Sequence, residues 1–207
     1  MARQTGPVCR LCRREKEKLF LKGQRCNTAK CGVMVREYPP GQRARFMPKA
    51  SDYQVRLREK QKARRMFGLM ERQLRNYFQK ADRQKGPTGV NLLVLLERRL
   101  DNVVYRLGFA AGRVQARQLV CHGHFRVNGR KVDIPSYLVS AGDEIELKPG
   151  SSDSAAVKDA AEIAKQREIP EWLQSDLKNF KGKVVRMPER DEMPDIQEQY
   201  IVELYSK

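Results

Sequence analysis

Four of the five cysteines in this 207-residue chain follow a spacing that is typical of structural metal sites. Two residues separate Cys9 from Cys12, four separate Cys26 from Cys31, and thirteen lie between the two pairs. Two close pairs joined by a short loop allow four thiolates to converge on one tetrahedral ion. The sequence therefore predicts that residues 1–41 form a small module held by a structural zinc ion.

Two disulfides, unpaired thiols and an iron–sulfur cluster are the alternatives to zinc. The first eight residues lack a signal-peptide core and no segment has the ~20 apolar residues of a membrane span, so we expect a cytoplasmic protein. A reducing compartment disfavours disulfides. Gly32 is expected to supply a positive φ beside the second pair. Cys121 lies far away in sequence and is not expected to be a ligand.

Several basic residues surround these cysteines in sequence. We expect them to offset the negative charge of a four-thiolate site and to lower the thiol pKa values. They are Arg10, Arg13, Arg14, Arg25 and Lys30.

Positive charge is concentrated in the first half of the chain. The sequence has 42 Lys and Arg against 25 Asp and Glu, a formal net charge of +17. Residues 1–90 contain 24 basic and seven acidic residues, so they carry the whole of that excess. Such a balance is typical of proteins that bind a polyanion, most often nucleic acid. With no lipidation signal and no apolar span, we expect no membrane partner.

Two helices are predicted in the basic region. Ser51 is a favourable N-cap for a helix that ends near residue 67, and a second helix is expected over residues 69–83. The first helix has few apolar residues, so we expect it to gain little from burial and to need a partner surface. Glu59 is the only acid between residues 53 and 69, so we expect few ion pairs to neutralise it. Residues 42–50 are expected to be extended.

The apolar pattern changes along the second half of the chain. Apolar residues at helical spacing predict one helix from Thr88 to Gly108, and a shorter helix is expected over residues 113–121. Asn128-Gly129 predicts a hairpin with a type I′ turn, because both residues tolerate positive φ. A further strand is expected over residues 143–147.

The remaining segments give weaker signals. Residues 151–168 are Ala-rich and predict a helix, and residues 170–190 predict short strands and turns. Residues 195–205 are compatible with either helix or strand.

A positive groove is predicted where the helix over residues 113–121 meets the hairpin, and such a groove suits a nucleic-acid backbone. Two arginines of the helix share one face, and the turn presents polar and basic residues close to them. The predicted RNA-binding residues come from three places: residues 42–50, the helix that begins at Ser51, and this groove. They are Arg43, Arg45, Arg56, Arg58, Lys60, Lys62, Arg64, Arg65, Arg113, Arg117, Gln118, Asn128, Arg130 and Lys131.

Short motifs spread over nearly the whole chain resemble one known family. They are Cys9-Arg-Leu-Cys-Arg-Arg14, Tyr38-Pro-Pro-Gly-Gln42, Ser51-Asp-Tyr53, Arg56-Leu-Arg-Glu-Lys-Gln-Lys62, Arg72-Gln73, Arg99-Leu-Asp-Asn-Val-Val-Tyr-Arg-Leu-Gly108, Ala116-Arg-Gln-Leu-Val120, Val127-Asn-Gly129 and Ile201-Val-Glu-Leu-Tyr-Ser206. In this order they resemble the S-four family of small-subunit ribosomal proteins, in its bacterial version with a four-cysteine zinc site. The chain departs at Arg43-Ala44, where the family often has His-Gly.

The resemblance implies an α+β fold. A basic helical domain over residues 42–91 would follow the cysteine module and be completed by residues 181–207. Residues 92–180 would form an inserted mixed domain with a small antiparallel sheet, and its helix–hairpin RNA-binding module would lie at about residues 97–150.

The resemblance also implies a function without catalysis. The protein would bind the five-prime domain of 16S rRNA early in assembly of the small subunit. It would lie beside ribosomal proteins of the S-five and S-three types, near the path by which messenger RNA enters, and would contribute to translational accuracy.

Two other functions share parts of this pattern. Arg99-Leu100-Asp101 is similar to the catalytic tripeptide of pseudouridine synthases, but only about 60 residues follow the module, too few for their catalytic domain. His122 and His124 have no nucleophile or orienting carboxylate beside them in sequence, so they do not indicate an enzyme. A zinc-containing DNA-binding regulator is the other alternative.

Overall fold

The computed structural model describes residue 4 and residues 6–42, 49–151, 155–164 and 168–206. The chain divides into two compact units, one of residues 1–92 with 195–207 and the other of residues 93–194. Among the described residues, no helix is long and apolar enough to cross a bilayer.

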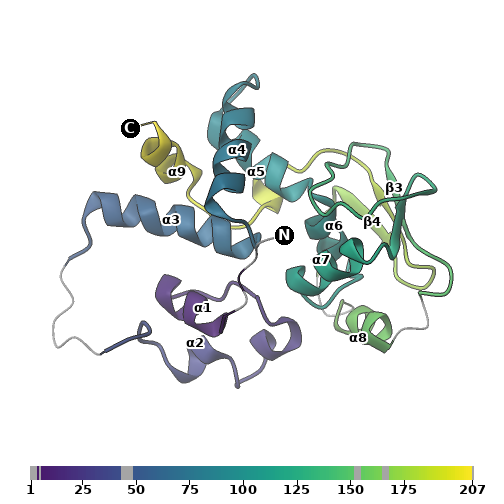
Figure 1. Cartoon of the computed structure of the whole chain (residues 1–207), viewed down its shortest axis with the longest axis horizontal. Coiled ribbons are helices and arrows are strands. Elements are labelled where there is room, and N and C mark those ends of the chain that lie inside the picture. Colours follow the sequence, from purple (N-terminus) through teal and green to yellow (C-terminus); the bar gives the residue numbers. More distant parts are fainter. Residues whose placement is uncertain (1–3, 5, 43–48, 152–154, 165–167, 207) are drawn as a thin grey trace. The chain divides into compact units, whose positions relative to one another are not determined.

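The first unit is helical. It begins with the short elements of the cysteine segment, and its longer helices follow after the described residues resume at Lys49 (Figure 1). The elements are α1 (Cys9–Glu15), the 3₁₀ turn η1 (Gly23–Asn27), α2 (Gly32–Val35), α3 (Asp52–Met66), α4 (Glu71–Asp82), α5 (Thr88–Glu97, which runs into the second unit) and α9 (Glu198–Tyr205).

The sequence predicted α3 and α4 correctly. Ser51 caps α3 as expected, and its hydroxyl accepts a hydrogen bond from the Gln54 backbone N–H at 3.3 Å. The ambiguous segment over residues 195–205 is the helix α9, which packs along α3. The Phe78 and Tyr205 rings, from α4 and α9, lie 4.8 Å apart.

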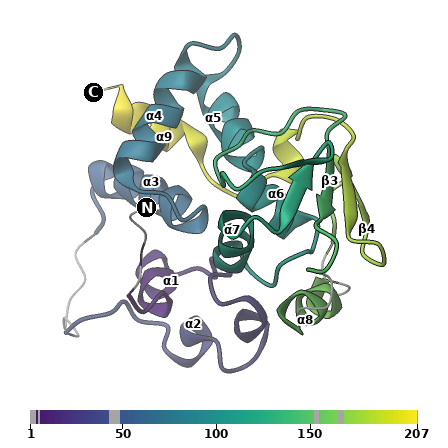
Figure 2. The ribbon, with the colours of Figure 1, turned by 45° about the vertical axis from the view of Figure 1, so that its right-hand side comes forward.

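The second unit is a mixed domain with a five-stranded antiparallel sheet of order β2-β1-β3-β5-β4 (Figure 2). Its helices are α6 and α7, which pack on each other, and α8. The mixed helical and antiparallel architecture expected from the sequence is therefore confirmed. The elements are α6 (Leu100–Arg106), α7 (Arg113–Cys121), β1 (Phe125–Val127), β2 (Arg130–Lys131), β3 (Glu144–Leu147), α8 (Ala155–Ala164), β4 (Leu173–Asp176), β5 (Lys181–Val184) and the 3₁₀ turn η2 (Arg190–Glu192).

The hairpin forms where Asn128-Gly129 predicted it. Asn128 has φ of 50° and Gly129 has φ of 76°, as a type I′ turn requires, and Val127 pairs with Arg130 across the turn. Strand β1 also pairs with β3, so the hairpin continues into the main sheet.

The prediction of one helix from Thr88 to Gly108 is wrong. The chain breaks between α5 and α6, where Arg99 has the extended values φ −64° and ψ 135°. A distant segment takes the hydrogen-bonding groups at this point: the Leu100 N–H donates to the Tyr137 carbonyl at 2.8 Å, and the Val139 N–H donates to the Arg98 carbonyl at 3.0 Å. The spacing of apolar residues could not show that residues 137–139 bind the backbone groups that a continuous helix would use.

The predicted domain boundary at residue 180 is also wrong. Residues 181–184 form β5, which lies in the sheet between β3 and β4, so the second unit continues to Pro194 and the helical unit resumes only at Asp195. Polar and small or apolar residues alternate over only four positions, Lys181 to Val184, which is too short a pattern to distinguish a strand from a linker.

Leu107, the residue that follows α6, packs closely on β5 in the core of the second unit. A Cβ placed on Gly182 would lie 2.6 Å from both terminal methyl carbons of Leu107, which is itself fully buried. Gly182 does not have a positive φ, so it is required for space alone.

We predict that Gly182→Ala destabilises the protein by about 1–3 kcal/mol, the usual cost of overpacking. Lys183→Ala, a change at the exposed neighbouring residue, is the control and should stay within about 0.5 kcal/mol of wild type. Urea unfolding of both variants measures the difference. Equal stability of the two variants would show that the contact with Leu107 relaxes freely.

Candidate nucleic-acid interface and cysteine module

The four predicted metal ligands lie around one small cavity. Cys9 and Cys12 stand on α1, Cys26 in η1 and Cys31 at the N-cap of α2, and all four line the cavity. All are free thiols, so the disulfide alternative is not formed. The Lys22 backbone N–H donates to Cys26 Sγ at 3.3 Å, a hydrogen bond that also suits a thiolate ligand.

The donor set fits a tetrahedral ion such as zinc, because four cysteines from two short turns line one cavity. Within the described residues, no three potential ligands are drawn together closely enough to define a metal site by geometry. Zinc therefore stays a prediction.

Gly32 serves a different purpose from the one expected. Its φ is not positive; instead, a Cβ at this position would lie 2.9 Å from Cys9 Cβ and 3.3 Å from Cys9 Sγ. The glycine therefore makes room for the first cysteine pair against the second.

The expectation that nearby basic residues lower the thiol pKa values is not met at two of the cysteines. Burial, and then the neighbouring thiols, raise the pKa of Cys12 and that of Cys26 above their ordinary values. The arginines are occupied elsewhere: Arg13 Nε donates to the Tyr38 carbonyl at 2.9 Å, and Arg25 Nε donates to the Lys30 carbonyl at 3.2 Å. These hydrogen bonds to backbone carbonyls stabilise the fold of the module.

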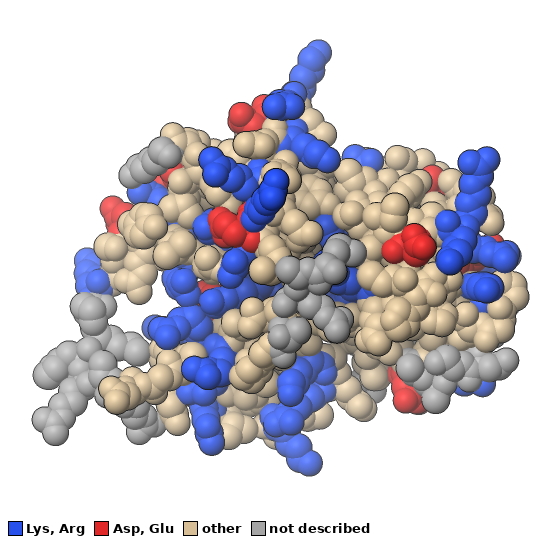
Figure 3. Space-filling view, in the orientation of Figure 1, with Lys and Arg blue, Asp and Glu red and all other residues tan. Residues whose placement is uncertain are grey.

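Helix α3 carries six of the predicted RNA-binding residues, and the structure gives each of them an acidic partner. Four of the five partner carboxylates come from outside the helix, which is why sequence-local reasoning missed them. Figure 3 shows Lys and Arg gathered over the part of this unit that contains α3 and the cysteine module. The pairs are Arg56–Glu203, Arg58–Glu15 (3.4 Å), Lys60–Glu71 (2.6 Å), Lys62–Glu17 (2.8 Å) and Glu59 (4.0 Å), Arg64–Glu71 (3.8 Å) and Arg65–Glu15.

The expectation that α3 gains little from burial is therefore wrong. Lys62, Ala63 and Met66 are buried, and the Glu15 side chain is only 2% exposed between two arginines. Burial raises the pKa of Glu15, while Arg65 and Arg58 oppose that rise. A buried acid with two cationic partners anchors α1 against α3. Arg43 and Arg45 lie outside the described residues.

The two arginines predicted on α7 are held by α6. Arg113 Nε donates to Asn102 Oδ1 at 2.8 Å, and Arg117 lies 3.6 Å from Asp101. Both side chains lie on the face of α7 that packs on α6, so each is anchored within the second unit. Only 13% of the Arg117 side chain is exposed.

The hairpin presents its basic residues differently. Arg130 and Lys131 are exposed, and the Lys131 side chain is 62% accessible, with Asp133 4.0 Å away. A Cβ on Gly123 would overlap Lys131 Cε, so the hairpin does lie against the end of α7 as predicted. Gln118 is exposed on α7.

Asn128 is used by the turn. Its Nδ2 donates to Asp143 at 2.8 Å, and its Oδ1 accepts from the Glu144 N–H at 2.9 Å. These bonds tie the hairpin to the start of β3.

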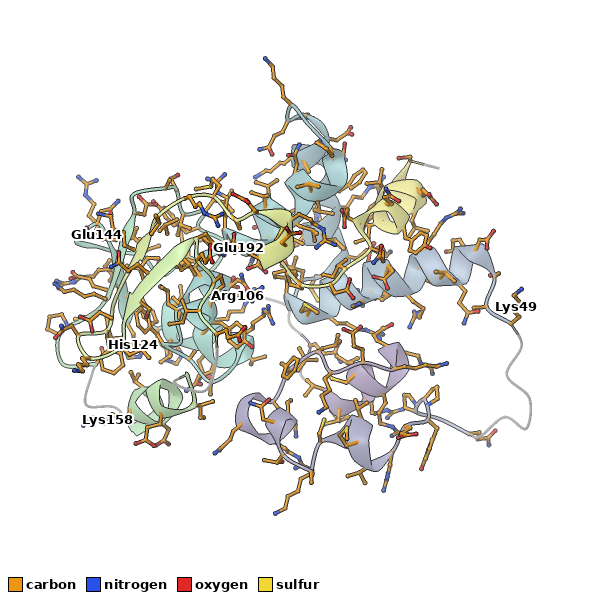
Figure 4. The ribbon with its side chains drawn as sticks, turned by 180° about the vertical axis from the view of Figure 1, so that it is seen from behind. Lys49, Arg106, His124, Glu144, Lys158 and Glu192 are labelled. Atoms are coloured by element: carbon orange, nitrogen blue, oxygen red, sulfur yellow. The ribbon has the colours of Figure 1, made fainter. Side chains whose placement is uncertain are left out.

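Asp101 has no catalytic environment. Its side chain is 6% exposed and accepts two hydrogen bonds from Arg99, at 3.0 and 2.7 Å. His124, which is labelled in Figure 4, does have a hydroxyl close by. Ser151 Oγ lies 3.0 Å from its Nδ1, a contact between residues 27 positions apart in the sequence. It joins the start of β1 to the loop after β3.

These observations define an RNA-binding protein, with a helix–hairpin module and a basic helical unit, and comparison with known proteins agrees. The model of the ribosomal protein S4/S9 N-terminal domain matches residues 3–97, and that of the S4 domain matches residues 98–145. Proteins named small ribosomal subunit protein uS4 from Thermodesulfovibrio yellowstonii and Geotalea daltonii are each 59% identical, and that of Geobacter sulfurreducens is 58% identical; all three alignments cover both chains completely.

The chain belongs to the uS4 family of ribosomal proteins. This confirms the family predicted from the motifs, and it confirms that the protein is not an enzyme.

The contacts of α3 give a pH-dependent prediction. Partial burial favours a high pKa at Glu71, but hydrogen bonds from Lys60 and Tyr205 outweigh it and lower that pKa below its usual value. A depressed pKa in the folded state stabilises the protein above the unfolded pKa, about 4.3, and this stabilisation is lost as the pH falls.

We therefore predict that Glu71→Gln lowers the free energy of unfolding most above about pH 5. The difference from wild type should shrink as the pH falls towards about 3. Denaturant unfolding of both proteins across this range measures it. A difference that is constant with pH would contradict the ion-paired state of Glu71.

Proposed function

We propose that this protein is a structural constituent of the small ribosomal subunit that binds rRNA directly. The observation that carries the proposal is its identity of 59% over the full length with proteins named for that subunit. The net charge of +17 supports it, because a polyanionic partner would offset the positive charge that internal ion pairs leave over.

The family resemblance makes the proposal more specific. The protein would bind the five-prime domain of 16S rRNA as a primary binder, nucleate assembly and contribute to accuracy. It would act in the cytoplasm, in the ribosome, beside S-five-type and S-three-type proteins and close to entering messenger RNA.

RNA binding of this kind should depend steeply on salt. Each phosphate that the protein neutralises contributes a slope of about −0.7 to −0.9 to the plot of log affinity against log salt. We predict a steep slope for a transcript of the five-prime domain, and poor competition by duplex DNA. Filter binding between low and moderate salt measures both. A flat dependence would contradict phosphate-driven binding.

The exposed hairpin residues should contribute to affinity and little to stability. We predict that Arg130→Glu with Lys131→Glu weakens transcript binding by about tenfold or more, while the melting temperature changes little, because both side chains are exposed. Arg117→Glu should behave differently and lower the melting temperature, because it would place a carboxylate beside buried Asp101.

Filter binding and thermal unfolding of these variants separate the two effects. If the hairpin reversal leaves affinity unchanged, this module is not an RNA surface, and the function would rest on the first unit.

We also propose that Cys9, Cys12, Cys26 and Cys31 hold one structural zinc ion. Four cysteines that line one small cavity, with the Lys22 backbone N–H donating to Cys26 Sγ, support this. The bound ion would offset the burial that otherwise raises the pKa of Cys12.

Cys26→Ser is predicted to release the metal and to make residues 1–41 sensitive to protease, because binding and folding of such a module are coupled. Exposed Cys121→Ser is the matched control and should keep one zinc per chain. Native mass spectrometry counts the metal. Full zinc occupancy in Cys26→Ser, or the absorbance of an iron–sulfur cluster in anaerobically purified wild type, would refute the assignment.

A further inference from the structure

A buried carboxylate lies at the centre of a polar network in the second unit. Glu97, at the end of α5, is fully buried. It accepts two hydrogen bonds from Arg106, at 3.0 and 3.1 Å. Burial alone would lower the pKa of Arg106, but the Glu97 carboxylate outweighs it and raises that pKa. This ion pair fixes a charged acceptor inside the domain.

Asn102 relays this fixed position to α7. Its amide nitrogen donates to Glu97 Oε2 at 2.8 Å and to the Glu97 carbonyl at 3.0 Å. Its amide oxygen therefore faces the other way, and it accepts the Arg113 Nε–H at 2.8 Å. The carboxylate decides the orientation of the amide, because only the NH₂ end can donate to it.

Arg113 is fixed on a second side by an aromatic ring. Its guanidinium carbon lies 4.5 Å from the centroid of the Tyr105 ring, a distance typical of a cation–π contact. Arg113 is the first residue of α7, the helix whose other end meets the hairpin. Two independent contacts therefore hold one cation in one orientation at the start of this helix.

We propose that Asn102 is a positioning residue for RNA binding, which acts by holding the Arg113 guanidinium in the orientation that receives an RNA phosphate. This inference rests on the proposed function of the α7–hairpin surface. A flexible arginine loses side-chain entropy when it binds a phosphate, whereas one that is already fixed loses less. Asn102 thus adds affinity without adding charge and without contacting RNA.

A double-mutant cycle tests this directly with the five-prime-domain transcript. We expect Asn102→Ala to weaken binding by about threefold to tenfold, and Arg113→Ala by about tenfold. If Asn102 acts through Arg113, the double variant should bind like Arg113→Ala alone. Asn102→Ala combined with Arg130→Ala is the matched control. Its losses should multiply, because Arg130 lies on the hairpin outside the network.

The possible outcomes separate the inference from the proposed function. If Arg113→Ala weakens binding but the losses of Asn102→Ala and Arg113→Ala multiply, Asn102 has only a structural role and the inference is wrong. If Arg113→Ala binds RNA with wild-type affinity, both the positioning role of Asn102 and the proposed RNA contact of Arg113 are wrong.

A further variant does not depend on the stability of Asn102→Ala. Arg113→Lys keeps the charge but removes the Nε hydrogen bond to Asn102, so affinity should fall by about threefold to tenfold at a temperature at which circular dichroism shows the variant to be folded. Wild-type affinity in Arg113→Lys would overturn the proposal.

Discussion

Ion pairs with a few carboxylates hold many basic side chains of both units in place. In the first unit, Glu15 and Glu71 each pair with two cations of α3. In the second, Glu97 and Asp101 anchor arginines of α6 and α7 directly or through Asn102. Acids are scarce in the first 90 residues, so a few of them must each serve more than one cation. Such internal ion pairs reduce the self-repulsion of a strongly basic folded chain.

The same pairing divides the basic residues into two kinds. Those on α3 and α7 are partly buried and already paired, so RNA would meet side chains whose positions are set. Those at the hairpin tip, Arg130 and Lys131, are exposed and can adapt to a phosphate. A fixed cation contributes orientation, whereas an exposed one contributes mainly long-range charge. Both contributions fit the proposed binding of a structured rRNA.

Local signals predicted local structure well and tertiary partners poorly. Ser51 marked the start of α3, and Asn128-Gly129 marked the hairpin, because capping and turn preferences depend on a few neighbouring residues. The break at Arg99 and the partners of α3 depend on residues such as Tyr137 and Glu203, which lie far away in sequence. Motif order indicated the family, which full-length identity confirms.

Hydroxyl-radical footprinting of small-subunit rRNA tests the proposed function most directly. Wild-type protein should protect a discrete set of nucleotides in the five-prime domain, and the variant with Arg130→Glu and Lys131→Glu should lose one part of that set while keeping the rest. This result would assign the lost part to the hairpin and the remainder to other surfaces of the chain. Uniform weak protection along the whole rRNA by the wild-type protein would contradict specific binding, and identical footprints from the two proteins would contradict the assignment of the hairpin.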